Sequence, residues 1–204
     1  MPKDKSESHA LIIKVAKQEF LKKGFMKASM REIGKKVGLT QAALYRHFKN
    51  KEDMFNCLVE PFVNQLLNYA KTHEENAYES YNETKSSEAM VSDNVVIMMK
   101  YFLQNYRDEL KLIVSCSHGT KYENFIHDLI KDETKQTLKA INYIRDNGVN
   151  IREINIDELH VLLSAYMSAI LEPIAHDWPY EKAVKCLDLI EEFFIPAWKN
   201  LMGF

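Results

Sequence analysis

The scarcity of turn-forming residues is the feature that most restricts how this chain can fold. It has 6 glycines and 5 prolines among 204 residues, whereas 46% of its residues are hydrophobic. A sandwich or barrel of short strands needs many more turn residues, and a disordered chain contains fewer apolar ones. We therefore expect an all-α fold of about nine helices, large enough to bury a substantial core.

Charge is distributed unevenly along the chain. Residues 1–51 contain 13 lysines and arginines against 4 aspartates and glutamates, whereas the remainder contains 14 basic and 25 acidic residues. The net charge of −2 is therefore the sum of a basic head and an acidic body. Such a head favours a polyanionic partner, either nucleic acid or an anionic membrane surface, although lysines that only solvate helices would give the same count.

Two helices are predicted before residue 38. Apolar residues recur every four positions across residues 7–25, which is the spacing of a half-buried helix, and Gly24 stops it. Ser29 and Glu32 have the spacing of a capping box, which indicates the start of a second helix. Gly38 ends that helix, at a position that requires a left-handed backbone conformation.

A third short helix follows the glycine turn. Thr40 can cap it, and its inner residues Leu44 and Phe48 are four positions apart. Two helices that hold a third in this way form a helix-turn-helix arrangement, whose third helix can enter a major groove. A generic three-helix bundle has the same spacing.

The rest of the chain predicts a larger helical region. A fourth helix should run from near Lys51 into the seventies, with a kink at Pro61, and residues 71–93 should form a frayed helix end and a loop. Further helices are expected at about 92–106, 109–117, 121–146, 155–176 and 179–202. We expect two domains, residues 1–51 and residues 52–204.

The last two predicted helices are apolar on more than one face. This surplus indicates a partner surface, because an antiparallel helix pair that meets its symmetry mate forms a four-helix interface. A helix pair buried within a single core is the alternative. The candidate dimer-interface residues are Leu163, Met167, Ile170, Leu187, Ile190, Phe194 and Trp198.

Three stretches resemble the amino-terminal domain of TetR-type (TetR/AcrR) transcriptional regulators. They are FLKKGF at 20–25, SMREIG at 29–34 and VGLTQAALYRHFKNKE at 37–52, and the resemblance covers about residues 8–55. Ala28 and Gly34 depart from the pattern, since the family often has Thr and Ala there. The resemblance implies a helix-turn-helix domain followed by a helical effector-binding and dimerisation domain. It further implies a ligand-responsive regulator, a repressor that binds a pseudo-palindromic operator as a homodimer and is released by a small molecule.

Five residues are candidates for contact with the DNA backbone. Ser29 and Thr40 cap helices whose exposed amides can bind a phosphate. Lys51 adds positive charge at the start of the fourth helix, which is unfavourable for the helix dipole unless an anion is present. The resemblance implies that Tyr45 and His47 contact the backbone or a thymine methyl group.

Three further residues are candidates for contact with the base edges, and a fourth permits close approach to the DNA. Gln41, Ala43 and Arg46 are placed to reach them, because glutamine can read adenine and arginine can read guanine with two hydrogen bonds each. Ala42 has almost no side chain and lets the helix approach the DNA closely.

The effector pocket is the least constrained prediction. Aromatic, methionine and polar residues can line an apolar cavity, and ordinary core packing is the alternative for each of them. The candidates are Tyr69, Met98, Tyr101, Phe102, Tyr106, Phe125, Tyr166, Glu172 and His176.

Enzymatic chemistry is not expected. Cys116 and His118 lack the paired spacing of a metal site, and no glycine-rich phosphate loop occurs, so we expect neither a metal nor a cofactor. The three cysteines are odd in number and widely separated, which favours a reducing compartment, the cytoplasm. A helical protein-interaction or membrane-surface module could use the same basic head, but it would not need the residue order from Thr40 to Lys51.

Overall fold

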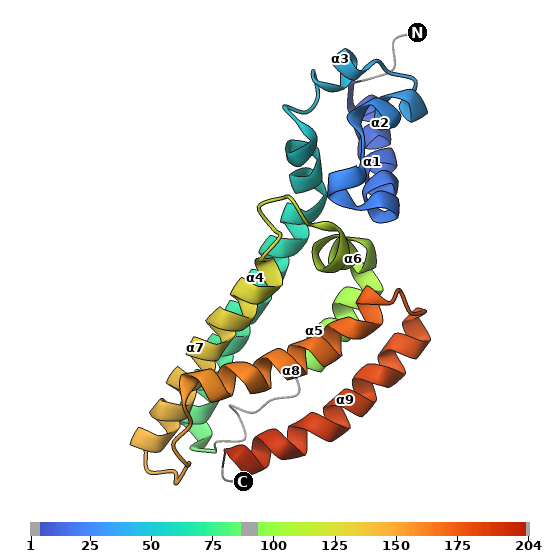
Figure 1. The fold of residues 1–204 in the computed structure, drawn as a ribbon. Helices are drawn as coiled ribbons and strands as arrows, with labels where there is room; N and C mark the ends of the chain where they lie inside the picture. Colours follow the sequence, from blue (N-terminus) through green and yellow to red (C-terminus); the bar gives the residue numbers. More distant parts are fainter. Residues whose placement is uncertain (1–4, 87–93, 203–204) are drawn as a thin grey trace. The chain divides into compact units, whose positions relative to one another are not determined.

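The computed structural model describes residues 5–86 and 94–202, and every regular element in these ranges is a helix (Figure 1). This agrees with the all-α prediction. The helices are α1 (Lys5–Lys27), α2 (Met30–Val37), α3 (Gln41–Leu44), α4 (Lys51–Thr84), α5 (Asn94–Asn105), α6 (Arg107–Cys116), α7 (Phe125–Asp146), α8 (Ile156–Ala175) and α9 (Tyr180–Leu201).

Both predicted glycine breaks are present. Gly24 interrupts the helical geometry of α1 with φ 71° and ψ 164°, and Gly38 ends α2 in the left-handed region with φ 75° and ψ 25°. The predicted capping box at Ser29 is wrong, because Ser29 occupies the N-cap position of α2 but its side chain makes no capping hydrogen bond. Backbone geometry therefore breaks α1 at Gly24 and ends α2 at Gly38, whereas the Ser29 hydroxyl does not cap the start of α2.

Helix α4 is longer than predicted. It continues through Pro61 to Thr84, so the prediction that residues 71–84 form a frayed end and loop is wrong. Polar residues such as Glu74 and Glu79 face solvent or a groove there without breaking the helix, because glutamate has a good helix propensity. Residues 87–93 lie outside the described residues, and the kink at Pro61 stays a prediction.

The chain divides into two compact units. The amino-terminal unit comprises residues 5–65 and 106–125, and the carboxy-terminal unit comprises residues 66–86, 94–105 and 126–202. In the amino-terminal unit, α1 packs against α2 and α6 around a core that includes the fully buried Phe20. This unit contains α6 and the first turns of α4, so it extends beyond residue 51. The functional boundary at residues 51 and 52 stays a proposal.

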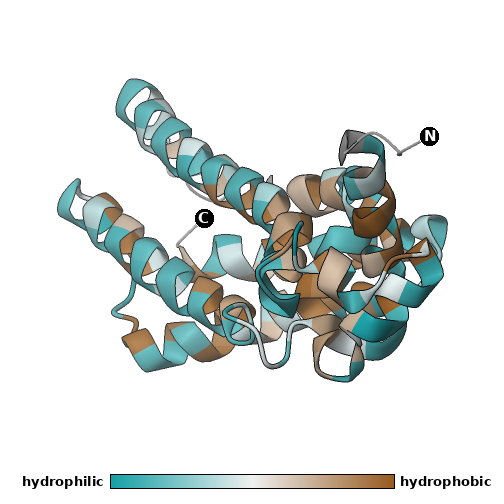
Figure 2. Ribbon diagram, turned by 90° about the horizontal axis from the view of Figure 1, so that it is seen from above, coloured by the Kyte–Doolittle hydropathy of each residue, from teal (hydrophilic) through white to brown (hydrophobic). Residues whose placement is uncertain are grey.

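In the carboxy-terminal unit, α8 and α9 form an antiparallel pair, and α5 also packs against α9 (Figure 1). Polar and apolar stretches alternate along the helices (Figure 2). No helix in the described ranges combines the length and the apolar character that crossing a membrane requires.

Candidate nucleic-acid interface and effector site

The turn between α2 and α3 depends on a close backbone approach at Gly34. The amide of Leu39 donates to the Gly34 carbonyl at 2.8 Å, and a Cβ atom on Gly34 would lie only 2.8 Å from the Leu39 carbonyl oxygen. Real Cβ atoms do not approach that closely, so a side chain at position 34 would push the two helices apart. Gly34, where the family often has alanine, therefore fits the tight turn between α2 and α3 in this chain.

Helix α3 is short and is stabilised at both ends. The Thr40 hydroxyl accepts a hydrogen bond from the Ala43 amide at 3.1 Å, as predicted. Beyond Leu44, the amides of His47 and Phe48 donate to the Leu44 carbonyl and continue the turn. Leu44 and Phe48 are buried, which confirms that they form the inner side of this helix.

The outer side of α3 is polar and accessible. Gln41, Ala42, Tyr45 and Arg46 are exposed, and the Gln41 side-chain amide donates to the Tyr45 hydroxyl at 3.4 Å. The structure removes Ala43 from the candidates for base contact, because it is only 8% exposed and packs on the inner side. The small size of Ala43 lets α3 pack closely on the rest of the amino-terminal unit.

A histidine that the sequence analysis missed lies beside this face. The His9 ring of α1 stacks on Phe48 with 4.9 Å between ring centroids, and it lies 6.2 Å from the ring of the half-buried His47. The spacing of His9 could have indicated this position. It precedes Ile12 by three residues and Ala16 by seven, so it lies in line with the buried stripe of α1. The start of α1 therefore lies next to the end of the α3 turn.

Lys51 has an intramolecular role. Its ammonium donates to the carbonyls of Phe25, Met26 and Ala28 at 2.7, 3.2 and 3.1 Å, and it lies 4.4 Å from the centre of the Phe25 ring. Burial lowers the pKa of Lys51. These contacts fix the Lys51 ammonium against carbonyl oxygens at and just beyond the end of α1. The phosphate contact of Lys51 stays a prediction, and it would have to share the ammonium with these carbonyls.

A buried carboxylate joins α1 to α2. The Glu19 side chain is fully buried, and its two oxygens each accept a contact at 2.5 Å, one from Lys23 and one from Lys36. Burial by itself raises the pKa of Glu19, but the hydrogen bonds from Lys23 and Lys36 outweigh it and hold that pKa below its ordinary value. Because Lys36 belongs to α2, this cluster helps to orient the helix that precedes α3.

Five of the seven predicted dimer-interface residues are buried in the core of their own protomer, and the interface itself stays a prediction. Leu163, Met167, Ile170, Leu187 and Ile190 are buried within the protomer, and Phe194 and Trp198 are half-buried against Tyr166. The large apolar side chains that α8 and α9 expose include Val161, Leu162, Leu189 and Phe193, besides Ile156 and Tyr180 at the helix starts. Sequence periodicity marks α8 and α9 as strongly apolar, but it does not separate their core side from their exposed side.

The predicted pocket residues do not converge on one cavity. Tyr69 contacts Phe102, with 6.2 Å between ring centroids, and Glu172 pairs with His176 on the exposed surface of α8. Tyr106 and Phe125 belong to the amino-terminal unit, whereas the other candidates belong to the carboxy-terminal unit.

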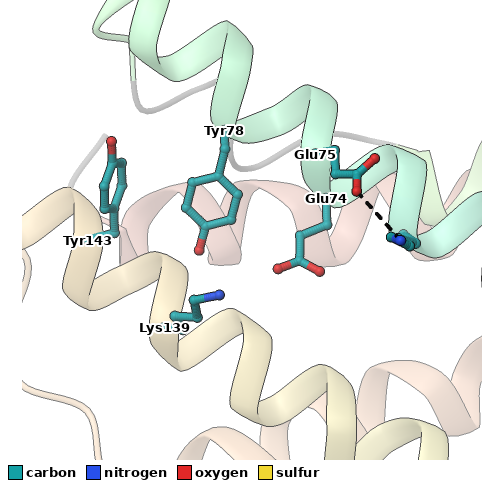
Figure 3. Close-up of a pocket in the computed structure, with 6 residues that line it drawn as sticks. Glu74, Glu75, Tyr78, Lys139 and Tyr143 are labelled. Carbon is teal, nitrogen blue, oxygen red and sulfur yellow. Dashed lines mark ion pairs between the residues drawn. The ribbon is translucent and has the colours of Figure 1, made fainter.

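A cavity of about 390 Å³ lies elsewhere in the carboxy-terminal unit, between α4 and α7, as Figure 3 shows. Its lining consists of Lys71, Glu74, Glu75, Tyr78, Lys139 and Tyr143. A second, more open cavity of about 510 Å³ shares Lys139 and Tyr143 and extends along α7 to Ile156. Neither lining includes a predicted pocket residue.

The amino-terminal unit has the geometry of a DNA-binding helix-turn-helix protein. A capped short helix is fixed from behind by Leu44 and Phe48 and presents glutamine, tyrosine and arginine outward. This face belongs to the segment of residues 1–51, in which 13 basic residues outnumber 4 acidic ones.

Comparison with known proteins gives matches to transcriptional regulators. Residues 12–58 match the family model described as bacterial regulatory proteins, tetR family. An HTH-type transcriptional regulator of Staphylococcus aureus strain USA300 is 23% identical over 177 residues, which cover 84% of this chain and 94% of the relative. The chain is similar to the TetR family in its amino-terminal domain and to HTH-type transcriptional regulators over most of its length. Its curated relatives are regulators and not enzymes.

Solved structures agree on the fold. The crystal structure of NalD, the secondary repressor of the MexAB-OprM multidrug efflux pump in Pseudomonas aeruginosa, has a TM-score of 0.52 at 17% sequence identity. The match covers 92% of this chain and 95% of NalD. A crystal structure of native NalD has a TM-score of 0.50 at 16% identity and covers 97% and 96% of the two chains.

Proposed function

We propose that this regulator is a cytoplasmic repressor that binds a pseudo-palindromic operator as a homodimer and is released by a small-molecule effector. The exposed polar face of α3 is the observation that carries the proposal. NalD, which has a similar fold, is itself described as a repressor.

In the proposed complex, Gln41 and Arg46 hydrogen-bond to base edges in the major groove. Tyr45 and His47 contact the backbone, and the small Ala42 permits close approach. The amides at the start of α2 and α3, beside Ser29 and Thr40, bind phosphates. Lys51 adds positive charge near the same backbone.

The proposed dimer uses the exposed apolar side of α8 and α9. Val161, Leu162, Leu189 and Phe193 lie on this side, and two of them, Leu189 and Phe193, are four positions apart on α9. Two-fold symmetry then presents two α3 helices to successive major grooves, which requires a separation of about 34–36 Å. An effector that binds only the conformation with another separation releases the DNA.

Pro61 is the proposed point at which the effector signal passes along α4. The helix is continuous through Pro61 and contributes residues to both units. A Pro61→Ala variant should therefore change operator affinity or its response to effector. Unchanged values of both in a binding titration would contradict this role.

The test of the proposed function is a salt titration with selected and random duplexes. A specific operator should bind more tightly than random DNA, and both affinities should fall steeply with added salt. Arg46→Ala should reduce the preference for the selected site by about 1–3 kcal/mol. Arg152→Ala, which removes an exposed arginine from the carboxy-terminal unit, is the matched control and should leave the preference unchanged.

Two outcomes would contradict the proposal. Equal affinity for selected and random duplexes would contradict specific recognition of an operator. Binding to anionic lipid vesicles in place of DNA would indicate that the basic head serves a membrane surface.

A further inference from the structure

Two histidines from different helices lie close together in the amino-terminal unit. The His9 ring of α1 stacks on Phe48 with 4.9 Å between ring centroids, and its centroid lies 6.2 Å from that of the His47 ring. His9 is exposed and His47 is half-buried. The pair therefore joins the start of α1 to the turn that follows α3, beside the exposed Arg46.

The ring nitrogens of this pair are available to a ligand. His118 and His176 each pair with a glutamate, and His160 lies within hydrogen-bond distance of a threonine hydroxyl. No hydrogen bond or ion pair within the described ranges engages the imidazole of His9 or of His47. Water solvates these nitrogens in the free protein, and an anion can take its place.

The charged groups of the α3 turn and of α4 give the pair no carboxylate partner. Arg46 and Lys49 flank His47 and Phe48 in the chain, and both are exposed. The carboxylate of Asp53, at the start of α4, accepts a hydrogen bond from the Lys49 amide at 2.9 Å. The charge that surrounds the pair on these two elements is therefore mostly positive.

The other helices that pack on α1 place their charged groups further along it. Lys36 of α2 pairs with Glu19, and Glu109 of α6 pairs with Lys17. On α1 itself, Glu7 is two positions from the histidine and so points to a different side of the helix. Two protonated imidazole rings would therefore repel each other, with no described carboxylate between them to offset the repulsion.

We propose that His9 and His47, both protonated, bind one phosphate of the DNA backbone between them, so that DNA binding is linked to proton uptake. A phosphate between two imidazolium rings removes their repulsion and accepts a hydrogen bond from each. The ring separation of 6.2 Å leaves room for it, because each N–H···O contact spans about 2.7–3.2 Å. Histidine titrates between about pH 5 and 8, so DNA affinity should rise as the pH falls through that range. This inference rests on the proposed function and deepens it, because it adds a backbone contact from α1 and a pH dependence.

A purely structural role for His9 makes a different prediction. A ring that only stacks on Phe48 supports the α3 turn at every pH and needs no charge. His9→Phe separates the two roles, because phenylalanine can stack on Phe48 but cannot be protonated. This variant should bind DNA about as tightly as the parent at pH 8 and several-fold more weakly than the parent at pH 6.

The test measures the affinity of the full chain for a random duplex by fluorescence anisotropy at fixed salt, from pH 8 to pH 6. The parent should gain at least tenfold more affinity over this range than the double variant His9→Phe and His47→Gln, because one linked proton gives up to tenfold per pH unit. His127→Gln, which removes an exposed histidine of α7, is the matched control and should follow the parent. The single variant His9→Phe tests the same point if loss of the half-buried His47 lowers stability.

Two further measurements separate charge from packing. Titration calorimetry in two buffers of different ionisation enthalpy counts protons, and the parent should take up more protons on binding DNA than His9→Phe does. The slope of log affinity against log salt should be steeper for the parent than for the double variant by about 1 at pH 6, and the two slopes should agree at pH 8.

Two results would overturn the inference: a pH profile of His9→Phe equal to that of the parent, or equal proton uptake by the two proteins. Failure of the proposed function gives a different result, because a phosphate contact is independent of base sequence. If selected and random duplexes bind equally but the histidine-dependent pH profile is present, operator recognition fails and the phosphate site stands. If the selected duplex is preferred but both substitutions leave the profile unchanged, operator recognition stands and this inference fails. If neither duplex binds, both fail.

Discussion

The two units of this protein specify their surfaces in different ways. In the amino-terminal unit, the eight residues from Gln41 to Phe48 alternate between side chains that are buried and side chains that are exposed. In the carboxy-terminal unit, α8 and α9 carry apolar residues on both their buried and their exposed sides. A short capped helix is oriented by a few local signals, whereas the orientation of a long apolar helix depends on neighbours that are distant in the sequence.

Buried and partly buried carboxylates show the same contrast. Glu19 in the amino-terminal unit has both Lys23 and Lys36 as partners, which gives a closed cluster. Glu74 in the carboxy-terminal unit is half-buried and forms no ion pair with a lysine or arginine in the described part of the chain. The first arrangement links α1 to α2, whereas the second leaves a carboxylate without a neutralising partner.

The largest predicted effect compares the same truncation in the two units. Phe48 is 2% exposed beneath α3, whereas Phe193 on α9 is 73% exposed. Phe48→Ala should lower the free energy of unfolding by about 3–5 kcal/mol, because it leaves a cavity behind the recognition helix. Chemical denaturation measures this loss.

Phe193→Ala is the matching truncation in the carboxy-terminal unit. It should change the free energy of unfolding of the protomer by less than about 0.5 kcal/mol, because an exposed ring loses few contacts. Sedimentation equilibrium should instead show weaker dimerisation. Unchanged dimerisation would argue against the α8 and α9 interface.

The next effect concerns Lys51. Lys51→Met keeps much of the apolar stem over Phe25 but removes the three hydrogen bonds to carbonyls at the end of α1. We expect a loss of about 2 kcal/mol in the free energy of unfolding. Lys49→Met removes an exposed lysine nearby and should cost almost nothing. If the two variants are equally stable and only DNA affinity falls, the structural role of Lys51 is wrong.

The sequence predicted the helix-turn-helix region well because its signals are local. The glycines at 24 and 38, the Thr40 cap and the inner pair Leu44 and Phe48 each act within a few residues of their own position. Ala43 was misplaced because a small side chain fits either side of a helix. His9 and the buried Glu19 were missed because their partners come from other helices.

In the carboxy-terminal unit the predicted helices α5, α7, α8 and α9 are confirmed to within four residues, and the prediction failed at the end of α4 and at the cavity. A polar run such as residues 71–84 reads as a frayed end, yet α4 continues there. The cavity residues Tyr78 and Tyr143 are 65 positions apart, and only the packing of α4 and α7 brings them together. Helical periodicity identifies an apolar stripe, but it does not say which neighbour covers it.

A smaller effect tests the closed charge cluster through its pH dependence. Because Lys23 and Lys36 hold the pKa of Glu19 below its ordinary value of 4.5, the ionised carboxylate stabilises the folded state above that pH. The stabilisation is lost as the pH falls through the lowered pKa of the folded state. Glu19→Gln should cost about 1–2 kcal/mol at pH 7 and progressively less below pH 4.5.

Denaturation of the parent and Glu19→Gln proteins at several pH values measures this difference. Glu7→Gln, an exposed residue of α1, is the matched control and should show no comparable convergence at low pH. A difference between parent and Glu19→Gln that stays constant down to pH 3 would mean that the cluster acts by packing and not by charge.

The smallest predicted effect separates helix propensity from close packing at Gly34. Alanine is favoured over glycine in a helix interior by about 1 kcal/mol, so propensity alone predicts that Gly34→Ala stabilises the protein. The added Cβ would lie 2.8 Å from the Leu39 carbonyl oxygen, and this backbone atom cannot move aside without opening the turn. We expect a net loss of about 1 kcal/mol in the free energy of unfolding, together with weaker operator binding, because α3 is displaced. Asn76→Ala on the exposed side of α4 supplies the propensity gain without the clash and should stabilise slightly. If Gly34→Ala stabilises the protein as much as Asn76→Ala does, the turn adapts to a methyl group, and the geometry of α3 is less tightly fixed than the buried Leu44 and Phe48 indicate.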